Sequence, residues 1–301
     1  MTSCAGRTVL DPALFPYSPL PARAPLAWPG GKPVAVWIAI ILDDWEIEPP
    51  ADGPRVPGAH GPWDNIPPDY RTWSYRAYGP RVGIHRLVDV LARHRLRATL
   101  AADSASCARY PEIIADCQAR GFEIAAHGSH ATRVISARMS EQDEAETIAR
   151  AADAVSRITG NRPAGWIGPE FGESEHTPRL LAEAGFTWVA DWPNDEQPYP
   201  LGTTPPLMVL PYSHALDDQE LIWLRHVAPW DYPRLIGQAL DRLALDGAAS
   251  GRVLGLGIRP WLFGRPHRVG YFAEAVARIA AHPAVWCATG GEIITAGKSG
   301  R

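Results

Sequence analysis

The sequence predicts an α/β protein whose strands and helices alternate along one chain. Three observations support this fold class. Residues 34–42 form an unbroken apolar run, which is typical of a strand buried on both faces of a parallel sheet. Apolar, strand-like segments then alternate with amphipathic segments about seven times. Polar residues follow most of these strands, as expected where a ligand binds at the carboxyl ends of parallel strands.

Length and composition exclude several classes of protein. A chain of 301 residues suits one large α/β barrel or two ordinary domains. The formal net charge of -4, with acidic and basic residues interspersed, argues against nucleic-acid or membrane-surface binding. The longest apolar run is too short to span a bilayer. Four scattered cysteines and the lack of a secretory signal pattern favour a reducing, cytoplasmic setting, and we expect a small-molecule partner.

The first thirty residues are predicted to form a Pro-rich N-terminal arm, residues 1–30. Phe15, Tyr17 and Trp28 offer more apolar surface than a solvated tail normally carries. The arm is expected to wrap the domain or a neighbouring subunit, which is compatible with a homo-oligomer; a flexible tail is the alternative. We assign residues 31–297 to the domain and 298–301 to a tail.

The elements follow in order from periodicity and caps. The first strand is followed by a Pro- and Gly-rich loop that is expected to reach Pro80. Ser140 caps one helix, Thr177 with a following proline begins another, and Thr289 with Glu292 forms a capping box. The predicted strands are residues 34–42, 98–102, 122–126, 164–167, 187–190, 207–210, 252–258 and 284–287. The predicted helices are residues 82–94, 110–120, 140–159, 177–184, 232–245 and 269–281, with a final short helix after 289.

The strand ends supply the candidate site residues. Asp43 and Asp44 follow the first strand, and His127 follows strand 122–126. Imidazole titrates near neutral pH and is the commonest metal ligand, so His127, with His130 nearby, marks a candidate reaction centre. The alternative is that Asp43 and Asp44 only cap the loop that follows the strand.

Further candidates for substrate binding follow later strands. We expect Glu170 to contact the substrate, and Asp191 to pair with Arg259 across the site, because a guanidinium binds planar acids bidentately. The alternative for Glu170 is an acid on a surface turn, and the alternative for Asp191 and Arg259 is a purely structural salt bridge. Four tryptophans that end or follow strands are expected to wall an aromatic pocket, with core packing as the alternative for each: Trp45, Trp166, Trp192 and Trp261.

Several motifs in fixed order carry a family resemblance: residues 78–83, 97–99, 109–111, 121–128, 159–166, 181–195 and 264–268. With them, the chain resembles the polysaccharide deacetylase (NodB-homology) superfamily over residues 30 to 297, and most of all the branch of PuuE-type allantoinases and cyclic imide hydrolases. The resemblance implies a single distorted (β/α) barrel of about seven units. It also implies hydrolysis of a carbon–nitrogen bond in a small amide, cyclic imide, ureide or N-acetyl substrate.

The resemblance also implies roles for individual residues. In metal-dependent members an Asp and two His hold a divalent ion, often zinc, and a second Asp takes the proton of the attacking water. Asp43 and Asp44 match these two aspartates in either order, and His127 matches the first histidine. The second histidine position is Ala131, so His130, one residue short, is a conditional ligand. The tentative metal set is therefore Asp44, His127 and His130.

Two further positions depart from the family pattern, and the first is in residues 167–170, where an expected arginine is absent. Arg259 stands where a late histidine would protonate the leaving amine, and arginine is a poor general acid. His267 is the remaining candidate for that proton. The altered pattern leaves open a zinc enzyme, or a metal-independent one with an Asp or His base and an Arg259 clamp. A repurposed lyase or cyclase of specialised metabolism, or a catalytically silent binder, is the alternative function.

Overall fold

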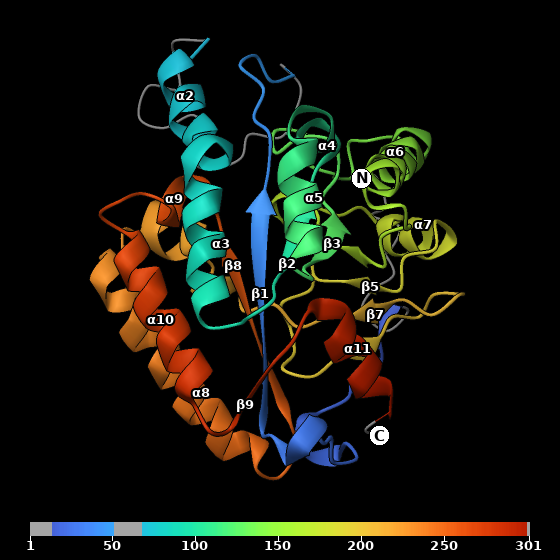
Figure 1. Ribbon diagram of the computed structural model, residues 1–301. Coiled ribbons are helices and arrows are strands. Elements are labelled where there is room, and N and C mark those ends of the chain that lie inside the picture. Colours follow the sequence, from blue (N-terminus) through green and yellow to red (C-terminus); the bar gives the residue numbers. More distant parts are fainter. Residues whose placement is uncertain (1–13, 51–67, 300–301) are drawn as a thin grey trace, which may run out of the picture.

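The computed structural model describes residues 14–50 and 68–299, and its centre is a nine-stranded sheet (Figure 1). The strand order is β6-β7-β5-β4-β3-β2-β1-β8, and β9 pairs with the start of β1. Every recorded pairing is parallel except that between β6 and β7. The strands are β1 (Val34–Leu42), β2 (Thr99–Ala102), β3 (Glu123–Ala126), β4 (Gly165–Trp166), β5 (Trp188–Val189), β6 (Tyr199–Pro200), β7 (Met208–Val209), β8 (Arg252–Ile258) and β9 (Val285–Cys287). The predicted parallel α/β fold is confirmed.

Strand β1 is the centre of the sheet and is buried along its whole length. Val36, Ile38 and Ile40 belong to the core beneath the outer helices, whereas Trp37 and Ile41 belong to a second core on the opposite face. This two-sided burial explains why the sequence shows a continuous apolar run here, because alternation appears only when one face is solvated.

The sheet curves into an incomplete barrel, because loops and not strands join its two edges. The Ser213 N–H, just beyond β7, donates to the Gly255 carbonyl of β8 at 3.0 Å. The Val253 N–H of β8 donates to the Glu196 carbonyl at 2.8 Å. From inside, the Trp37 indole N–H donates to the Pro211 carbonyl at 3.0 Å. These contacts produce the distorted barrel that the sequence predicts.

Helices cover the outside of the barrel, except that the last helix, Gly290–Ser299, packs on the interior core through Ile293 and Ile294 (Figure 1). They are α2 (Tyr70–Tyr78), α3 (Ile84–Arg93), α4 (Ser104–Arg109), α5 (Pro111–Ala119), α6 (Glu141–Thr159), α7 (Thr177–Glu183), α8 (Tyr232–Gly247), α9 (Pro260–Phe263), α10 (Val269–Ala281) and α11 (Gly290–Ser299). Ser140 caps α6 by accepting the Asp143 N–H, and Gly160 ends that helix with a φ of 73°. Both ends agree with the predicted caps. No helix among the described residues is long and apolar enough to cross a membrane.

The segment before α3 corrects one prediction. Residues 70–83 are helical, not loop: α2 leads into a wide π-helical turn, Gly79–Gly83. The Asp69 carboxylate caps α2 by accepting the Thr72 N–H at 3.0 Å. Pro80 is tolerated at the start of the wide turn, where its missing N–H interrupts no bond that the turn needs. The helix places Arg76 above the carboxyl ends of the strands. The other part of that predicted loop, residues 51–67, lies outside the described residues.

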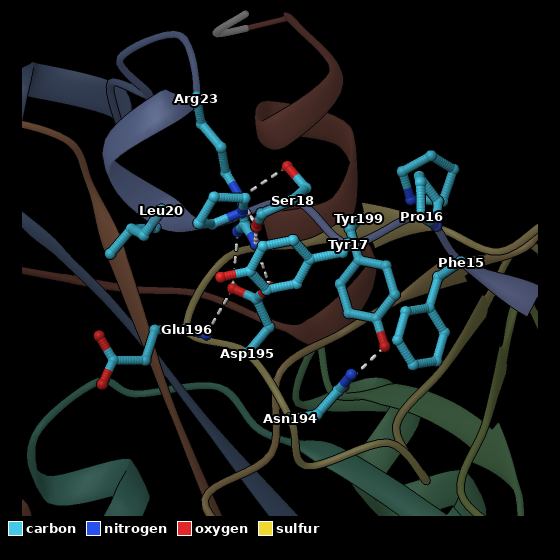
Figure 2. Close-up of a pocket in the computed structure, with 12 residues that line it drawn as sticks. Phe15, Pro16, Tyr17, Ser18, Leu20, Arg23, Asn194, Asp195, Glu196 and Tyr199 are labelled. Atoms are coloured by element: carbon cyan, nitrogen blue, oxygen red, sulfur yellow. Dashed lines mark hydrogen bonds and ion pairs between the residues drawn. The ribbon is translucent and has the colours of Figure 1, made fainter. Parts of the chain in front are cut away.

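The described part of the arm, residues 14–30, lies against the domain (Figure 2). The Phe15 ring packs edge-on against Trp192 and Tyr199, with centroid distances of 5.9 and 5.6 Å. Arg23 binds the Asp195 carboxylate with two hydrogen bonds, of 2.8 and 2.5 Å. Arm and domain line a pocket of about 590 Å³, and Asp43, His127 and Arg259 are not among the residues that line it. Residues 1–13 lie outside the description.

Candidate active site

The carboxyl ends of β1, β3 and β8 bring charged side chains together, as parallel topology predicts. Asp43 follows β1, His127 follows β3 and Arg259 follows β8. All three are buried. Arg259 acts electrostatically on both Asp43 and His127, so the three side chains share one environment. The structure thus places three of the predicted site residues in one cluster.

Asp43 is a buried carboxyl that is poised to accept a proton. The Trp45 indole N–H donates to Asp43 Oδ2 at 3.1 Å. Burial raises the pKa of Asp43 to about 6, although the positive charges of Arg259 and Arg76 oppose the rise. A pKa in this range suits a group that takes and returns a proton near neutral pH.

Asp44 has a different environment from its neighbour. Its Oδ1 accepts from the Arg109 guanidinium at 2.8 Å, and its backbone N–H donates to Asp103 Oδ2 at 2.7 Å. Burial raises the pKa of Asp44, and Arg109 opposes the rise. Asp103 also accepts the Ser106 N–H, so this buried acid fixes the turn that follows β1. The geometry therefore separates a hydrogen-bonded Asp43 from an ion-paired Asp44.

His127 is held as a neutral imidazole. Its Nδ1 lies 2.6 Å from the Ile167 carbonyl oxygen, so Nδ1 carries the proton and Nε2 is left as an acceptor. Burial lowers the pKa of His127 to about 4, and Arg259 lowers it further. The Gly128 that follows has a φ of 68° and would press a side chain against Pro169, which explains the glycine after the histidine.

Arg259 pairs with acids that the sequence did not indicate. Its Nη1 donates to Asp217 Oδ1 at 2.6 Å and lies 3.3 Å from Asp218 Oδ1. Its backbone N–H donates to Asp218 Oδ2 at 2.7 Å, and the Tyr212 hydroxyl binds Asp217. The predicted pairing with Asp191 is wrong: Asp191 instead accepts the Gly168 N–H with both carboxylate oxygens, at 2.8 and 3.0 Å.

Glu170 faces the same cluster from the loop after β4. Its backbone lies in the left-handed region, with a φ of 50°, and so does that of Phe171, with a φ of 55°. Two such non-glycine residues in succession cost about 1–2 kcal/mol each. Gln219 Nε2 donates to both Glu170 carboxylate oxygens, at 2.8 and 3.0 Å. The carboxylate acts electrostatically on Asp43 and Arg259, so the strained turn directs it toward the cluster.

Arg76, like Asp217 and Asp218, is a site residue that the sequence analysis missed. It is 3% exposed, and its guanidinium carbon lies 3.6 Å from the centre of the Trp45 ring and 4.7 Å from that of Trp261. Burial lowers the pKa of Arg76 to about 10, although Asp43 and Glu170 raise it. The Asp69 cap was the available signal for the helix that carries Arg76.

Two of the four predicted tryptophans, Trp45 and Trp261, line the cluster through their contacts with Arg76. The other two, Trp166 and Trp192, make contacts elsewhere. Trp166 is fully buried and packs edge-on against Phe186 at 5.5 Å, so core packing describes it. The Trp192 indole N–H donates to Glu173 Oε1 at 3.0 Å beneath the arm. The predicted four-tryptophan pocket reduces to Trp45 and Trp261.

His267 is not brought to the cluster. It is exposed on the turn between α9 and α10, and no recorded contact joins it to the buried site residues. Its predicted role as proton donor has no geometric support, because the turn points it into solvent.

The chain is similar in sequence and in fold to polysaccharide deacetylases. The polysaccharide deacetylase family matches residues 77–189. A candidate polysaccharide deacetylase from Schizosaccharomyces pombe is 25% identical over 246 residues, 73% of each chain. A solved candidate deacetylase from Mycobacterium smegmatis is 29% identical, covers 92% of this chain and 94% of its own, and has a TM-score of 0.76. These matches make residues 77–189 similar to a polysaccharide deacetylase domain, and the chain as a whole similar to the NodB-homology superfamily. Its fold is also that of PuuE allantoinase, with a TM-score of 0.80 at 22% identity over 99% of this chain and 98% of the other.

Metal binding, which this superfamily suggests, depends on which residues stand at the ligand positions. The second histidine position is Ala131, which is buried. His130 is half-buried and lines a separate cavity of about 580 Å³ with Ser129 and Arg133. No group of three His, Cys, Asp or Glu side chains within residues 14–50 and 68–299 could hold a metal ion. The tentative set of Asp44, His127 and His130 does not converge, so these residues do not fit a zinc site.

Proposed function

We propose that the chain hydrolyses a carbon–nitrogen bond of a small amide, cyclic imide, ureide or N-acetyl substrate, with Asp43 as the base. The similarity to polysaccharide deacetylases supports a carbon–nitrogen hydrolase, and a lyase, a cyclase or a silent binder is not favoured. The observation that carries the assignment of residues is Asp43: a buried carboxyl with a pKa of about 6, beside a neutral histidine and two arginines.

The reaction follows from these protonation states. Ionised Asp43 takes a proton from water, and the water oxygen attacks the carbonyl carbon. His127 Nε2, the free acceptor of the neutral imidazole, orients the water through its second hydrogen. When the carbon–nitrogen bond breaks, protonated Asp43 returns its proton to the leaving nitrogen. A single carboxyl thus serves as base and then as acid, so no late histidine is required.

Substrate size is limited by the space at Asp43. The cavity beside Asp43 has a volume of about 10 Å³, which is room for about one water molecule, and Trp45, Trp73, Arg76 and Tyr110 line it, so a substrate enters only if these side chains move. Aromatic walls and a few directed polar groups are typical of small-molecule sites. A cytoplasmic setting and a homo-oligomer stay predictions from the sequence.

A substrate screen with matched variants tests the proposal. Purified protein is assayed on allantoin, succinimide and N-acetylglucosamine, with release of the acid or amine as the readout. Asp43→Asn is expected to abolish turnover, while Asp89→Asn, an exposed residue of α3, leaves it unchanged. Turnover that survives in Asp43→Asn would remove Asp43 from the mechanism.

A further inference from the structure

A cavity of about 580 Å³ lies between the loop after β3 and the first half of α6. Its volume is within the range of small-molecule sites. Ser129 and His130 line it, and they follow His127 on the same loop. Among the described residues, none that lines this cavity also lines the small cavity beside Asp43. The larger cavity is therefore a separate candidate site next to the reacting cluster.

Positively charged side chains outnumber acids in the lining of this cavity. Arg133, Arg138 and Arg150 line it, and Asp143 is the single acid among the described lining residues. The Arg133 guanidinium is paired at 2.7 Å with Glu46, which lies outside the lining. Arg138 and Arg150 form no ion pair with any residue in the part of the chain that the structure describes. The cavity therefore has an excess of positive charge even when Glu46 is counted.

Several hydrogen-bond donors of the cavity have no acceptor among residues 14–50 and 68–299. The Arg150 Nε donates to the Glu146 carbonyl at 3.2 Å, but its Nη groups donate to no described residue. The Ser136 hydroxyl accepts the Arg138 backbone N–H at 3.4 Å, yet neither this hydroxyl nor that of Ser129 donates to a described acceptor. An oxyanion accepts from guanidinium and hydroxyl donors alike, so it matches these groups.

His130 adds a neutral donor to the same lining. Burial lowers the pKa of His130, so its imidazole is uncharged at neutral pH. Its Nδ1 is buried and has no hydrogen-bond partner among the residues that the structure describes. A buried polar atom without a partner is costly, and a ligand oxygen that accepts an N–H from this ring removes that cost.

The cavity also has apolar lining residues, Pro50, Val134 and Met139. Such side chains contact the carbon skeleton of a ligand and contribute affinity by burying apolar surface. A cavity of this volume holds a ligand larger than a bare anion. The lining therefore fits an anionic group that is attached to an organic body.

We propose that this cavity binds a small organic phosphate, a monoester whose phosphoryl group is held by the arginine and serine side chains of the lining. A phosphate monoester carries a charge of about −1.5 to −2 at neutral pH and has three strong acceptor oxygens. A carboxylate has one charge and two oxygens, so it matches the excess of cations and donors less well. None of the reacting residues takes part in this binding.

Calorimetric titration of the full chain with phenyl phosphate measures this binding, and line broadening of the ligand in phosphorus NMR is a second readout. The wild type is expected to bind. The double variant Arg138→Met with Arg150→Met is expected to lose affinity by roughly tenfold or more, because charge-assisted hydrogen bonds to the phosphoryl group are removed. A double variant that keeps the wild-type affinity overturns the proposal, and so does a wild type that does not bind.

Arg157→Met is the matched control. Arg157, like Arg150, is an exposed arginine of α6 whose Nε donates to the carbonyl four residues earlier at 3.2 Å, but it does not line the cavity. This variant is expected to keep the wild-type affinity. Near-UV circular dichroism identifies any variant that fails to fold. The double variant Ser129→Ala with Ser136→Ala removes hydroxyl donors without changing charge, and it is expected to weaken binding as well.

Two comparison ligands define the chemical class. Inorganic phosphate lacks the carbon skeleton and is expected to bind more weakly than phenyl phosphate. Succinate has two negative charges but no phosphoryl group, and it is also expected to bind more weakly. Equal affinity for inorganic phosphate overturns the assignment to an organic ester, and equal affinity for succinate overturns the assignment to phosphate.

A further variant separates this cavity from the site at Asp43. Arg109 lines the cavity beside Asp43 and pairs with Asp44, so it could also attract an anion. Loss of binding in Arg109→Met, with full binding in the Arg138 and Arg150 double variant, would place the anion at the reacting cluster and overturn the proposal. Asp43→Asn, which is expected to abolish turnover, is expected to keep the phosphate affinity. The proposed hydrolysis and the phosphate site can therefore fail independently.

Discussion

Replacing Arg259 with methionine is expected to destabilise the fold by about 3–5 kcal/mol, because it leaves Asp217 and Asp218 buried without their cation. The Arg259, Asp217 and Asp218 side chains are 5%, 2% and 0% exposed. Water therefore cannot solvate the remaining carboxylates in place of the guanidinium. Methionine fills a similar volume, so the loss reports charge and hydrogen bonding more than packing.

The size of the effect can be worked from the structure. Arg259 supplies two side-chain contacts and one backbone N–H to this cluster, and the backbone contact survives substitution. A loss of 3–5 kcal/mol is a large fraction of the about 5–15 kcal/mol by which domains are stable. For a chain of 301 residues, with an unfolding entropy of about 2.1 cal/mol/K per residue, it corresponds to a decrease in Tm of roughly 5–8 °C.

Urea denaturation followed by far-UV circular dichroism measures the change, with Arg242→Met as the exposed control. Asp217→Asn and the double variant complete a thermodynamic cycle. The double variant is expected to be more stable than the sum of the single changes implies, by about 1–3 kcal/mol, because removing the carboxylate removes the charge that Arg259 compensates.

The pH dependence has a defined sign. Burial raises the pKa of Asp218 well above its usual range and Arg259 opposes the rise, so without Arg259 the folded-state pKa of Asp218 rises further above its unfolded value. Such a group contributes stability below the unfolded pKa and loses it as pH rises through the folded pKa. Arg259→Met is therefore expected to be less destabilising at pH 5 than at pH 8. A loss below about 1 kcal/mol at both pH values, with additive cycle energies, would refute the reasoning.

Three further outcomes are expected. Asp43→Asn lowers kcat by about 10²–10⁴-fold, and wild-type kcat/KM falls as pH drops below about 6, where Asp43 gains a proton; a flat acid limb would argue for another base. Glu173→Gln stabilises the protein by on the order of 1–3 kcal/mol at pH 8 and little at pH 5 in thermal melts. Burial beside Asp191 raises the pKa of Glu173 well above its usual range, so its stability contribution is lost as pH rises. Dialysis against EDTA is expected to leave kcat unchanged, because alanine stands at one ligand position, Ala131, and the Asp44 carboxylate is already paired with Arg109. Loss of activity on dialysis that added Zn²⁺ reverses would contradict this expectation.

The fold was predictable because its signals are local. The apolar run of β1, the caps of α6 and the glycine after His127 each depend on residues within a few positions. Parallel topology then brings the strand ends to one edge, whatever the side chains there prove to be. Asp43, His127 and Arg259 could be placed together on that basis alone.

The partners of these residues were not predictable, because they depend on contacts far apart in the sequence. Several acidic residues follow strands at that edge of the sheet, and the sequence does not indicate which of them forms an ion pair with Arg259. The Arg259 guanidinium meets Asp217 and Asp218 because the chain after β7 folds back onto β8: the Ser213 N–H donates to the Gly255 carbonyl. Gly257 makes room for this, since a Cβ there would lie 1.5 Å from the Tyr212 hydroxyl oxygen.

Arg76 shows why an arrangement of charges is harder to predict than a fold. Glycine and proline next to it suggest a loop, yet the glycines are there so that the turn after α2 can lie against α9. The same contact brings Arg76 over Trp45 and near Asp43, which tunes the carboxyl that the sequence did identify. A substitution at Gly83 should therefore act on the site as well as on packing. It would move Arg76 away from Asp43 without changing any polar residue.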